Sequence, residues 1–308
     1  MSKRRVSNLS FAQYITVMEP NTDYSPSSTL PIRKLHVDLS QGFGRHWHGG
    51  DAFRTAYYNA LSMSFPEGEQ RFIDSVQACA KLLPDEPRHA QLREQIRDFC
   101  AQEATHRHMH AQYNAQLEKQ GFVNEWEPRI VRRFAEAADM NPLHHLAITA
   151  GFEHYTAVLA EVLLERPKML ESAEPAMRQV WMWHAMEETE HKAVAFDLYQ
   201  AVSGAYKWRV RWFLFVTMLF VSDVLRQTVS NLRHDKTLFR LSTWWSALTF
   251  FFGLPGSKRQ PTGNGILWLA PRHLLSYFRK DFHPWQQNNR AQASAYAQEH
   301  STEWRVVR

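Results

Sequence analysis

A Glu-x-x-His pair occurs twice in this sequence. Glu103 and His106 form the first pair, and Glu188 and His191 form the second. On an α-helix, residues spaced in this way project from one face, about one turn apart. A carboxylate and an imidazole so placed can bind the same metal ion. The two pairs therefore indicate metal chemistry on two helices.

A single glutamate precedes each pair at nearly the same distance. Glu69 precedes Glu103, and Glu153 precedes Glu188. Two helices that give one Glu each and two that give Glu-x-x-His each supply the ligands of a di-iron or di-manganese four-helix bundle. The repeated spacing predicts two similar helical hairpins that face each other across a metal pair. Glu67 could take the place of Glu69 as a ligand, but we prefer Glu69.

His184 extends the second pair into a longer stripe. It lies one helical turn before Glu188, so that His184, Glu188 and His191 share one face of the predicted helix. We expect His184 to be a seventh ligand. The alternative is a histidine that belongs to an aromatic cluster with Trp181 and Trp183.

Other polar residues lie next to the predicted ligands. His110 follows His106 by one turn and is either a hydrogen-bond partner of a ligand or a satisfied buried histidine. Glu187 and Glu190 lie off the ligand face. They are either solvated or part of the layer around the ligands, in which we place Glu187.

The donor set favours particular metals. Four carboxylates and three imidazoles suit iron or manganese, whereas zinc takes fewer ligands in tetrahedral geometry. A buried carboxylate without a cation normally takes up a proton, and Glu153 lies in a stretch that is otherwise small and apolar. We expect two iron ions, with manganese or zinc as alternatives, and Glu103, Glu153 and Glu188 as the catalytic carboxylates. Glu103 and either Glu188 or Glu153 would bridge the two ions.

Apolar periodicity predicts an all-α fold, a ferritin-like four-helix bundle with additional aromatic helices towards the C-terminus. No stretch alternates as a β-strand does. Pro66 predicts a break or a helix start, and the helix that begins at Pro175 is expected to run to about Val202. The predicted segments are an irregular one over 1–50, the di-metal bundle over 51–203, an aromatic extension over 204–286 that packs on the bundle or on a membrane surface, and a polar tail over 287–308.

Composition excludes some classes of protein. The chain has 308 residues, 44% hydrophobic and 22% charged, as in ordinary globular proteins. A net charge of +5 does not indicate nucleic-acid binding, but it is compatible with weak attraction to an anionic membrane. Cys79 and Cys100 lack metal-site or redox spacing, which predicts free thiols in a reducing cytoplasm. The basic N-terminus has no apolar core of a signal peptide. We expect a cytoplasmic protein, with peripheral contact to the inner membrane as a further expectation.

The most apolar run is Trp212–Val221. It is about half as long as the roughly 20 apolar residues that a spanning helix needs. We expect a core helix or an interfacial, membrane-docking helix rather than a membrane span.

Six stretches of the chain carry a resemblance to a known family: Asn59–Ser62, Phe65–Glu69, Gln102–His106 with His110 and Asn114, Phe152–Ala157, Trp183–Asp197 and Phe282–Trp285. Through them the chain resembles the bacterial family described as predicted metal-dependent hydrolases. The resemblance implies a ferritin-like helical core with a metal site, and we add Asn114 to the layer around the ligands. His184-x-x-x-Glu188-x-x-His191 is also similar to the ligand pattern of the arylamine N-oxygenases, which are di-iron enzymes.

Three functions follow from these patterns. The leading one is a di-iron oxygenase or oxidase that uses O₂ and an electron donor on a hydrophobic small molecule or lipid, with the aromatic segments over 205–253 as the wall of its pocket. The second is a hydrolase that uses a hydroxide bound by the metal pair. The third is a non-catalytic, metal-stapled protein that docks on a membrane. The aromatic segments could also form a homodimer.

Overall fold

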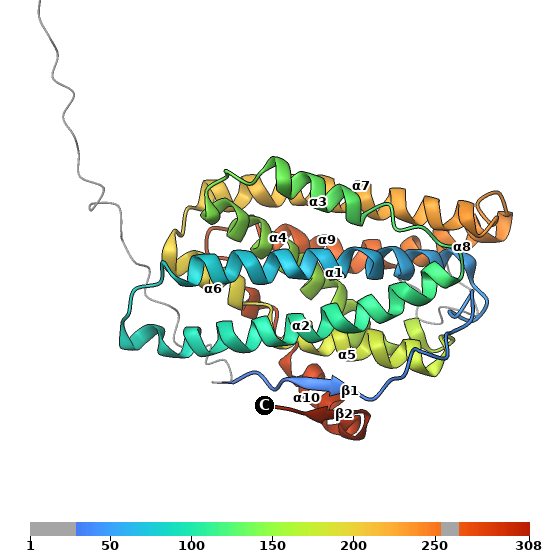
Figure 1. Ribbon diagram of the computed structural model, residues 1–308, viewed down its shortest axis with the longest axis horizontal. Helices are drawn as coiled ribbons and strands as arrows, with labels where there is room; N and C mark the ends of the chain where they lie inside the picture. The colour runs from blue at the N-terminus through green and yellow to red at the C-terminus, as the bar shows by residue number, and fades with distance from the viewer. Residues whose placement is uncertain (1–28, 254–264) are drawn as a thin grey trace, which may run out of the picture.

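The computed structural model describes residues 29–253 and 265–308, and its architecture is an all-α helical bundle (Figure 1). Residues 1–28 of the segment predicted to be irregular, and residues 254–264 of the predicted aromatic extension, lie outside the described residues. The α-helices are α1 (Ala52–Ala80), α2 (Ala90–Lys119), α3 (Glu127–Glu136), α4 (Pro142–Glu165), α5 (Pro175–His191), α6 (Val194–Val202), α7 (Tyr206–His234), α8 (Leu241–Phe252), α9 (Ile266–Ser276) and α10 (Arg290–Glu299).

Helices α1, α2, α4 and α5 form the centre of the bundle. Helix α1 packs against α2, and α4 packs against α5, so that each pair forms one hairpin. The two hairpins meet through α1 with α4 and through α2 with α5. All the predicted ligands lie on these four helices, which therefore position the site.

Helix α1 is continuous through Pro66, contrary to the break that the sequence predicts. Proline has no backbone N–H, so the carbonyl of Ser62, four residues earlier, loses its usual helical partner. Asn114 of α2 replaces that partner, because its Nδ2 donates to the Ser62 carbonyl at 2.9 Å. A side chain from the neighbouring helix thus satisfies the carbonyl that Pro66 leaves without its helical donor.

Two of the central helices begin at a proline, Pro142 and Pro175, and the second start is the one that the sequence predicts. Pro142 opens α4 after the N-cap residue Asn141, whose side chain accepts from the backbone N–H of Leu143. Pro175 opens α5, but this helix ends at His191 instead of running to Val202. At the bend, the buried Lys192 donates from Nζ to Asn289 Oδ1 at 2.7 Å and lies over the Trp285 ring.

A small antiparallel sheet corrects the prediction that the chain has no strand. Strand β1 (Arg33–Leu35) pairs with β2 (Trp304–Val306), with Arg33 opposite Val306 and Leu35 opposite Trp304. The segment predicted as a polar tail thus contains α10 and β2. The sheet lies along the lower side of the bundle, beside α2 and α5 (Figure 1).

Helices α7, α8 and α9 cover another side of the bundle. Helix α7 packs on α1 and α4, α8 packs on α1, and α9 packs on α4 and α8. Within the described part of the chain, α7 alone has the length and apolar composition of a bilayer-crossing helix, and 39% of its most apolar window is buried in the protein. A core helix of a soluble protein meets the same two criteria.

Candidate metal centre

The seven predicted ligands lie together inside the bundle. Helix α1 gives Glu69, α2 gives Glu103 and His106, α4 gives Glu153, and α5 gives His184, Glu188 and His191. Each of these seven residues is at most 4% exposed. The alternative Glu67 instead pairs with Arg71 away from the cluster. Helical spacing therefore brings every predicted ligand to one place, although whether each one binds metal stays a prediction.

Short distances link the imidazoles to the carboxylates. His184 Nε2 lies 2.9 Å from Glu188 Oε1, and His106 Nδ1 lies 3.5 Å from the same oxygen. His191 Nε2 lies 3.2 Å from Glu103 Oε1 and 3.7 Å from Glu153 Oε2.

Several overlapping sets of three residues have ligand atoms within 4.8 Å of one another and could hold a metal ion. They are Glu69, His110 and His184; His106, His184 and Glu188; Glu69, Glu103 and His106; and Glu103, Glu188 and His191. Glu103 and Glu188 each belong to two sets without His110. Shared residues of this kind are suited to bridging two ions.

Each of the three imidazoles has one nitrogen held from outside the cluster. His106 Nε2 hydrogen-bonds Glu187 Oε2 at 3.0 Å, and His191 Nδ1 donates to Gln102 Oε1 at 3.0 Å. His184 Nδ1 lies 2.7 Å from His110 Nε2. The other nitrogen of each ring faces the carboxylates. Metal-binding histidines are oriented in this way, by a partner on the nitrogen that does not bind the metal.

A chain of hydrogen bonds sets the tautomer of His184. Because Asn114 donates from Nδ2 to the Ser62 carbonyl, its Oδ1 is free to accept from the Ser62 hydroxyl at 2.8 Å. That hydroxyl has one hydrogen, so it must accept from Nδ1 of His110 at 2.9 Å.

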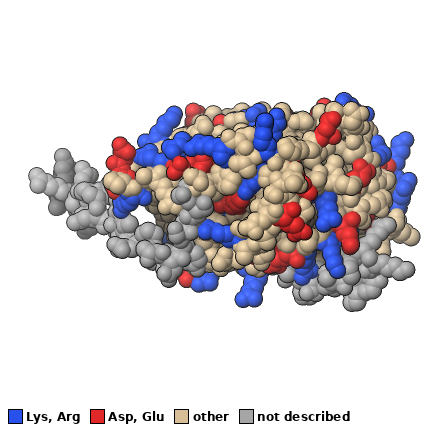
Figure 2. All heavy atoms as spheres, turned by 90° about the horizontal axis from the view of Figure 1, so that it is seen from below, with Lys and Arg blue, Asp and Glu red and all other residues tan. Residues whose placement is uncertain are grey.

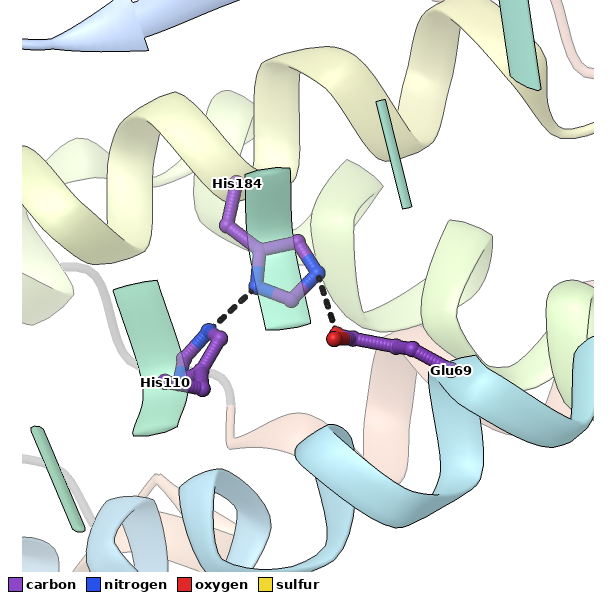
Figure 3. Close-up of side chains that lie close together, drawn as sticks. All are labelled: Glu69, His110 and His184. Carbon is purple, nitrogen blue, oxygen red and sulfur yellow. Dashed lines mark hydrogen bonds and ion pairs between the residues drawn. The ribbon is translucent and has the colours of Figure 1, made fainter. Parts of the chain in front are cut away.

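A neutral His110 then has only an acceptor at Nε2, to which His184 donates from Nδ1. The His184 Nε2 atom, which then carries a lone pair, faces Glu69 (Figure 3). It also faces Glu188 Oε1, which lies 2.9 Å away. This is the tautomer that a metal ligand needs.

Arg33 on β1 holds the other side of the site. Its guanidinium donates to Glu187 Oε1 at 3.2 Å and to both oxygens of Glu190 at 2.8 Å. Gln102 Nε2 also donates to Glu190. Glu187 is thus buried in the layer around the ligands and is not solvated. Local patterns along the chain do not identify Arg33 or Gln102 as supports, because their partners lie far away in sequence.

The buried polar atoms of the cluster fit a cation. Both carboxylate oxygens of Glu69, Glu103 and Glu153 are buried without a hydrogen-bond partner, as are His106 Nδ1 and His191 Nε2. Unpaired buried donors and acceptors are costly. Oxygen and imidazole donors that converge with their lone pairs unused are the usual surroundings of iron, manganese or zinc.

The pKa shifts agree with a site that binds positive charge. Burial, followed by the nearby Glu103, raises the pKa of Glu69 and of Glu153 well above the usual range. Burial also raises the pKa of Glu103. Burial alone would raise that of Glu188 too, but the surrounding imidazoles, His191 first, hold its pKa well below the usual range. Bound cations would keep all four carboxylates ionised and displace protons from the cluster.

An apolar cavity of about 50 Å³ reaches the cluster at His184 and Glu188. Its other lining residues are aromatic and aliphatic, apart from Thr156, and none of them is charged. They come from α1, α4, α5, the first residue of α9 and Met169 in the turn between α4 and α5. The aromatic wall is thus provided mainly by Tyr57, Tyr58, Phe65 and Trp181, and not by the segments over 205–253 that the sequence suggested.

A helical bundle with buried Glu and His clusters able to hold metal defines the class of protein: an all-α, metal-binding protein. The chain belongs to the family described as predicted metal-dependent hydrolase, whose model matches residues 31–288. No curated protein and no solved structure matches the chain.

Proposed function

We propose that this protein is a di-iron oxygenase or oxidase that acts on a hydrophobic small molecule or lipid. The observation that carries the proposal is the convergence of four buried glutamates and three histidines whose outer nitrogens are all held by partners. This ligand set, one Glu from each of two helices and Glu-x-x-His from each of two others, is that of carboxylate-bridged di-iron bundles.

Two irons in such a site would supply the activation of O₂, with electrons from a donor. The protein would bind them through Glu69, Glu103, His106, Glu153, His184, Glu188 and His191. Glu103 and Glu188, which each belong to two of the candidate sets, are the bridging candidates. The partners Glu187, Gln102 and His110 would keep the rings oriented. The packed bundle would exclude bulk water from the reaction.

The cavity supports an apolar substrate. Its lining holds no lysine or arginine that could neutralise a phosphate or a carboxylate. An apolar group placed there would reach the cluster at Glu188 and His184. Substrate recognition would therefore depend on shape and on apolar contact.

Hydrolysis is the second candidate, and the description of the family favours it. The same ligands could hold two metal ions that supply an activated water. Because the cavity lacks cationic residues, an uncharged ester of an apolar acid would suit it better than a phosphoester.

The deciding experiment is anaerobic purification followed by metal analysis and exposure to air. About two irons per chain, a near-ultraviolet charge-transfer band on oxidation and consumption of O₂ would support the oxygenase. Bound zinc or manganese that does not respond to O₂, with turnover of apolar esters under nitrogen, would overturn it in favour of hydrolysis. A protein that binds no metal would contradict both.

A further inference from the structure

The outer surface of α7 and α8 is unusually apolar. Twelve of the nineteen exposed large hydrophobic side chains among the described residues lie between Trp208 and Phe252. On α7 they form a stripe at helical spacing: Leu214, Met218, Val221 and Leu225, with Phe215 beside it. On α8 they are Leu241, Trp244, Trp245, Leu248 and Phe252. We call these two sets together the α7–α8 face.

Every exposed charge of this part of the chain is positive. Residues 204–253 contain two acidic residues, Asp223 and Asp235. Asp223 is buried against Arg129 and Arg133, and Asp235 pairs with Arg45 and His46. The exposed basic residues are Lys207, Arg211, Arg226, Arg233, Lys236 and Arg240.

The basic residues bracket the apolar stripe on α7. Lys207 and Arg211 precede Leu214, whereas Arg226 and Arg233 follow Leu225. The lower side of the molecule, opposite α7 in Figure 1, differs: there basic and acidic side chains are interspersed (Figure 2). An apolar centre with positive ends is complementary to a surface with an apolar interior and negative headgroups.

The inner face of α7 fixes how the helix can meet a bilayer. Gln227 donates to the carbonyl of Val123 at 2.9 Å, and Asn231 donates to the carbonyl of Ala56 at 3.0 Å. These bonds and the buried Asp223 tie α7 to the bundle. Crossing a bilayer would expose all three polar side chains to hydrocarbon. The helix can therefore lie along a membrane but not across it.

We propose that the α7–α8 face docks on an anionic phospholipid surface. The leucines, Met218 and the tryptophans would enter the boundary between headgroups and acyl chains, where tryptophan is favoured. The basic residues would lie among the lipid phosphates. A second copy of the chain fits less well, because two-fold pairing of this face would bring like charges together. The proposal does not depend on the chemistry of the metal centre.

Vesicle flotation with the full metal-loaded chain tests this docking. We expect binding to vesicles of phosphatidylcholine with phosphatidylglycerol, weak binding to phosphatidylcholine alone, and a decrease as salt is raised. No binding to the anionic vesicles at low salt would overturn the proposal.

Matched variants locate the surface. Met218→Glu on α7 and Trp245→Glu on α8 each place a negative charge on the face, and each should reduce vesicle binding by about tenfold or more. Leu82→Glu, at an exposed leucine elsewhere, should leave binding unchanged. Unchanged circular dichroism and metal content would exclude misfolding and separate this result from the proposed function.

Two outcomes would contradict the assignment of the face. One is equal loss of binding with Leu82→Glu. The other is a dimer that Met218→Glu converts to monomers in a chain that does not bind vesicles, which would identify the face as a contact between copies.

Discussion

The two sides of the candidate metal centre are built from different materials. Around His106 and His191 the supports are polar: Glu187, Gln102 and, behind them, Arg33. Around His184 the supports are His110 and an aromatic wall, with the Phe65 ring 4.8 Å from the His184 ring. The apolar cavity opens on this second side.

The electrostatics follow the same division. Burial opposes charge on His106, but hydrogen bonds with Glu187 and Glu188 raise its pKa to about 10. Burial and the neighbouring His106 lower the pKa of His184 to about 4. One side therefore holds the cluster in place through charge, whereas the other keeps a neutral imidazole next to an apolar space.

Removing a carboxylate shared by both sides should have the largest effect. In Glu188→Ala we expect metal content to fall from about two ions per chain to near zero, with loss of activity. Elemental analysis of the purified variant measures this. Glu67→Ala, on the surface side of α1, is the control and should keep its metal. Stoichiometric iron in Glu188→Ala would refute the assigned site.

Arg33→Met tests the polar side. The buried Glu187 would lose its cation, and breaking one partner of a buried ion pair costs about 3–5 kcal/mol. Metal affinity should fall by about 10- to 100-fold, because Glu187 orients His106. Chemical denaturation and metal titration measure the two effects. Lys34 is exposed on the same strand, and Lys34→Met should change neither stability nor metal affinity. Unchanged metal affinity in Arg33→Met would show that β1 does not support the metal site.

His110→Phe and Gln102→Leu compare the supports of the two sides directly. Each removes the partner of one imidazole, and each should weaken metal binding by about tenfold. Competition with a chelator measures the affinities. His108→Phe, exposed on the same helix as His110, is the matched control. If only Gln102→Leu weakens binding, His110 does not support a metal ligand on the apolar side.

Asn114→Ala tests the support of α1 at Pro66. The Ser62 carbonyl would lose its donor, at a cost of about 1–3 kcal/mol of unfolding free energy. In a Pro66→Ala background the restored backbone N–H should remove most of that cost. A double-mutant cycle by thermal or chemical denaturation measures the coupling. Additive effects of the two substitutions would show that Asn114 does not compensate for the proline.

The pH dependence of chelator-treated protein tests the electrostatic difference between the two sides, and here we expect the smallest effect. His106 has a raised pKa, so its contribution to stability is complete below about 6.5 and is lost as pH rises towards about 10. His184 has a lowered pKa, so its cost appears as pH falls from about 6.5 through about 4. Imidazole NMR at neutral pH should show a charged His106 and a neutral His184. The opposite assignment would reverse the two sides.

The sequence predicts much of this protein because helical geometry is local. The spacing of Glu103 with His106, and of Glu188 with His191, fixes which side chains share a face whatever surrounds the helix. The lone Glu69 and Glu153 add two more helices, and the absence of strand periodicity gives the all-α class. The match of the chain to a family of predicted metal-dependent hydrolases agrees with that interpretation.

Packing between elements determines the features that local sequence patterns do not predict. Helix α5 is buried on nearly all sides, so Glu187 lies inside the protein although its position is off the ligand stripe. Helix α1 continues through Pro66, and Asn114 from α2 donates to the carbonyl that the proline leaves without a partner. Strand β1 forms because residues near the C-terminus pair with it. Arg33 and His110 support the site through contacts with Glu187 and His184, which lie far away in sequence. Such partners depend on packing between elements, and no periodicity within one element encodes them.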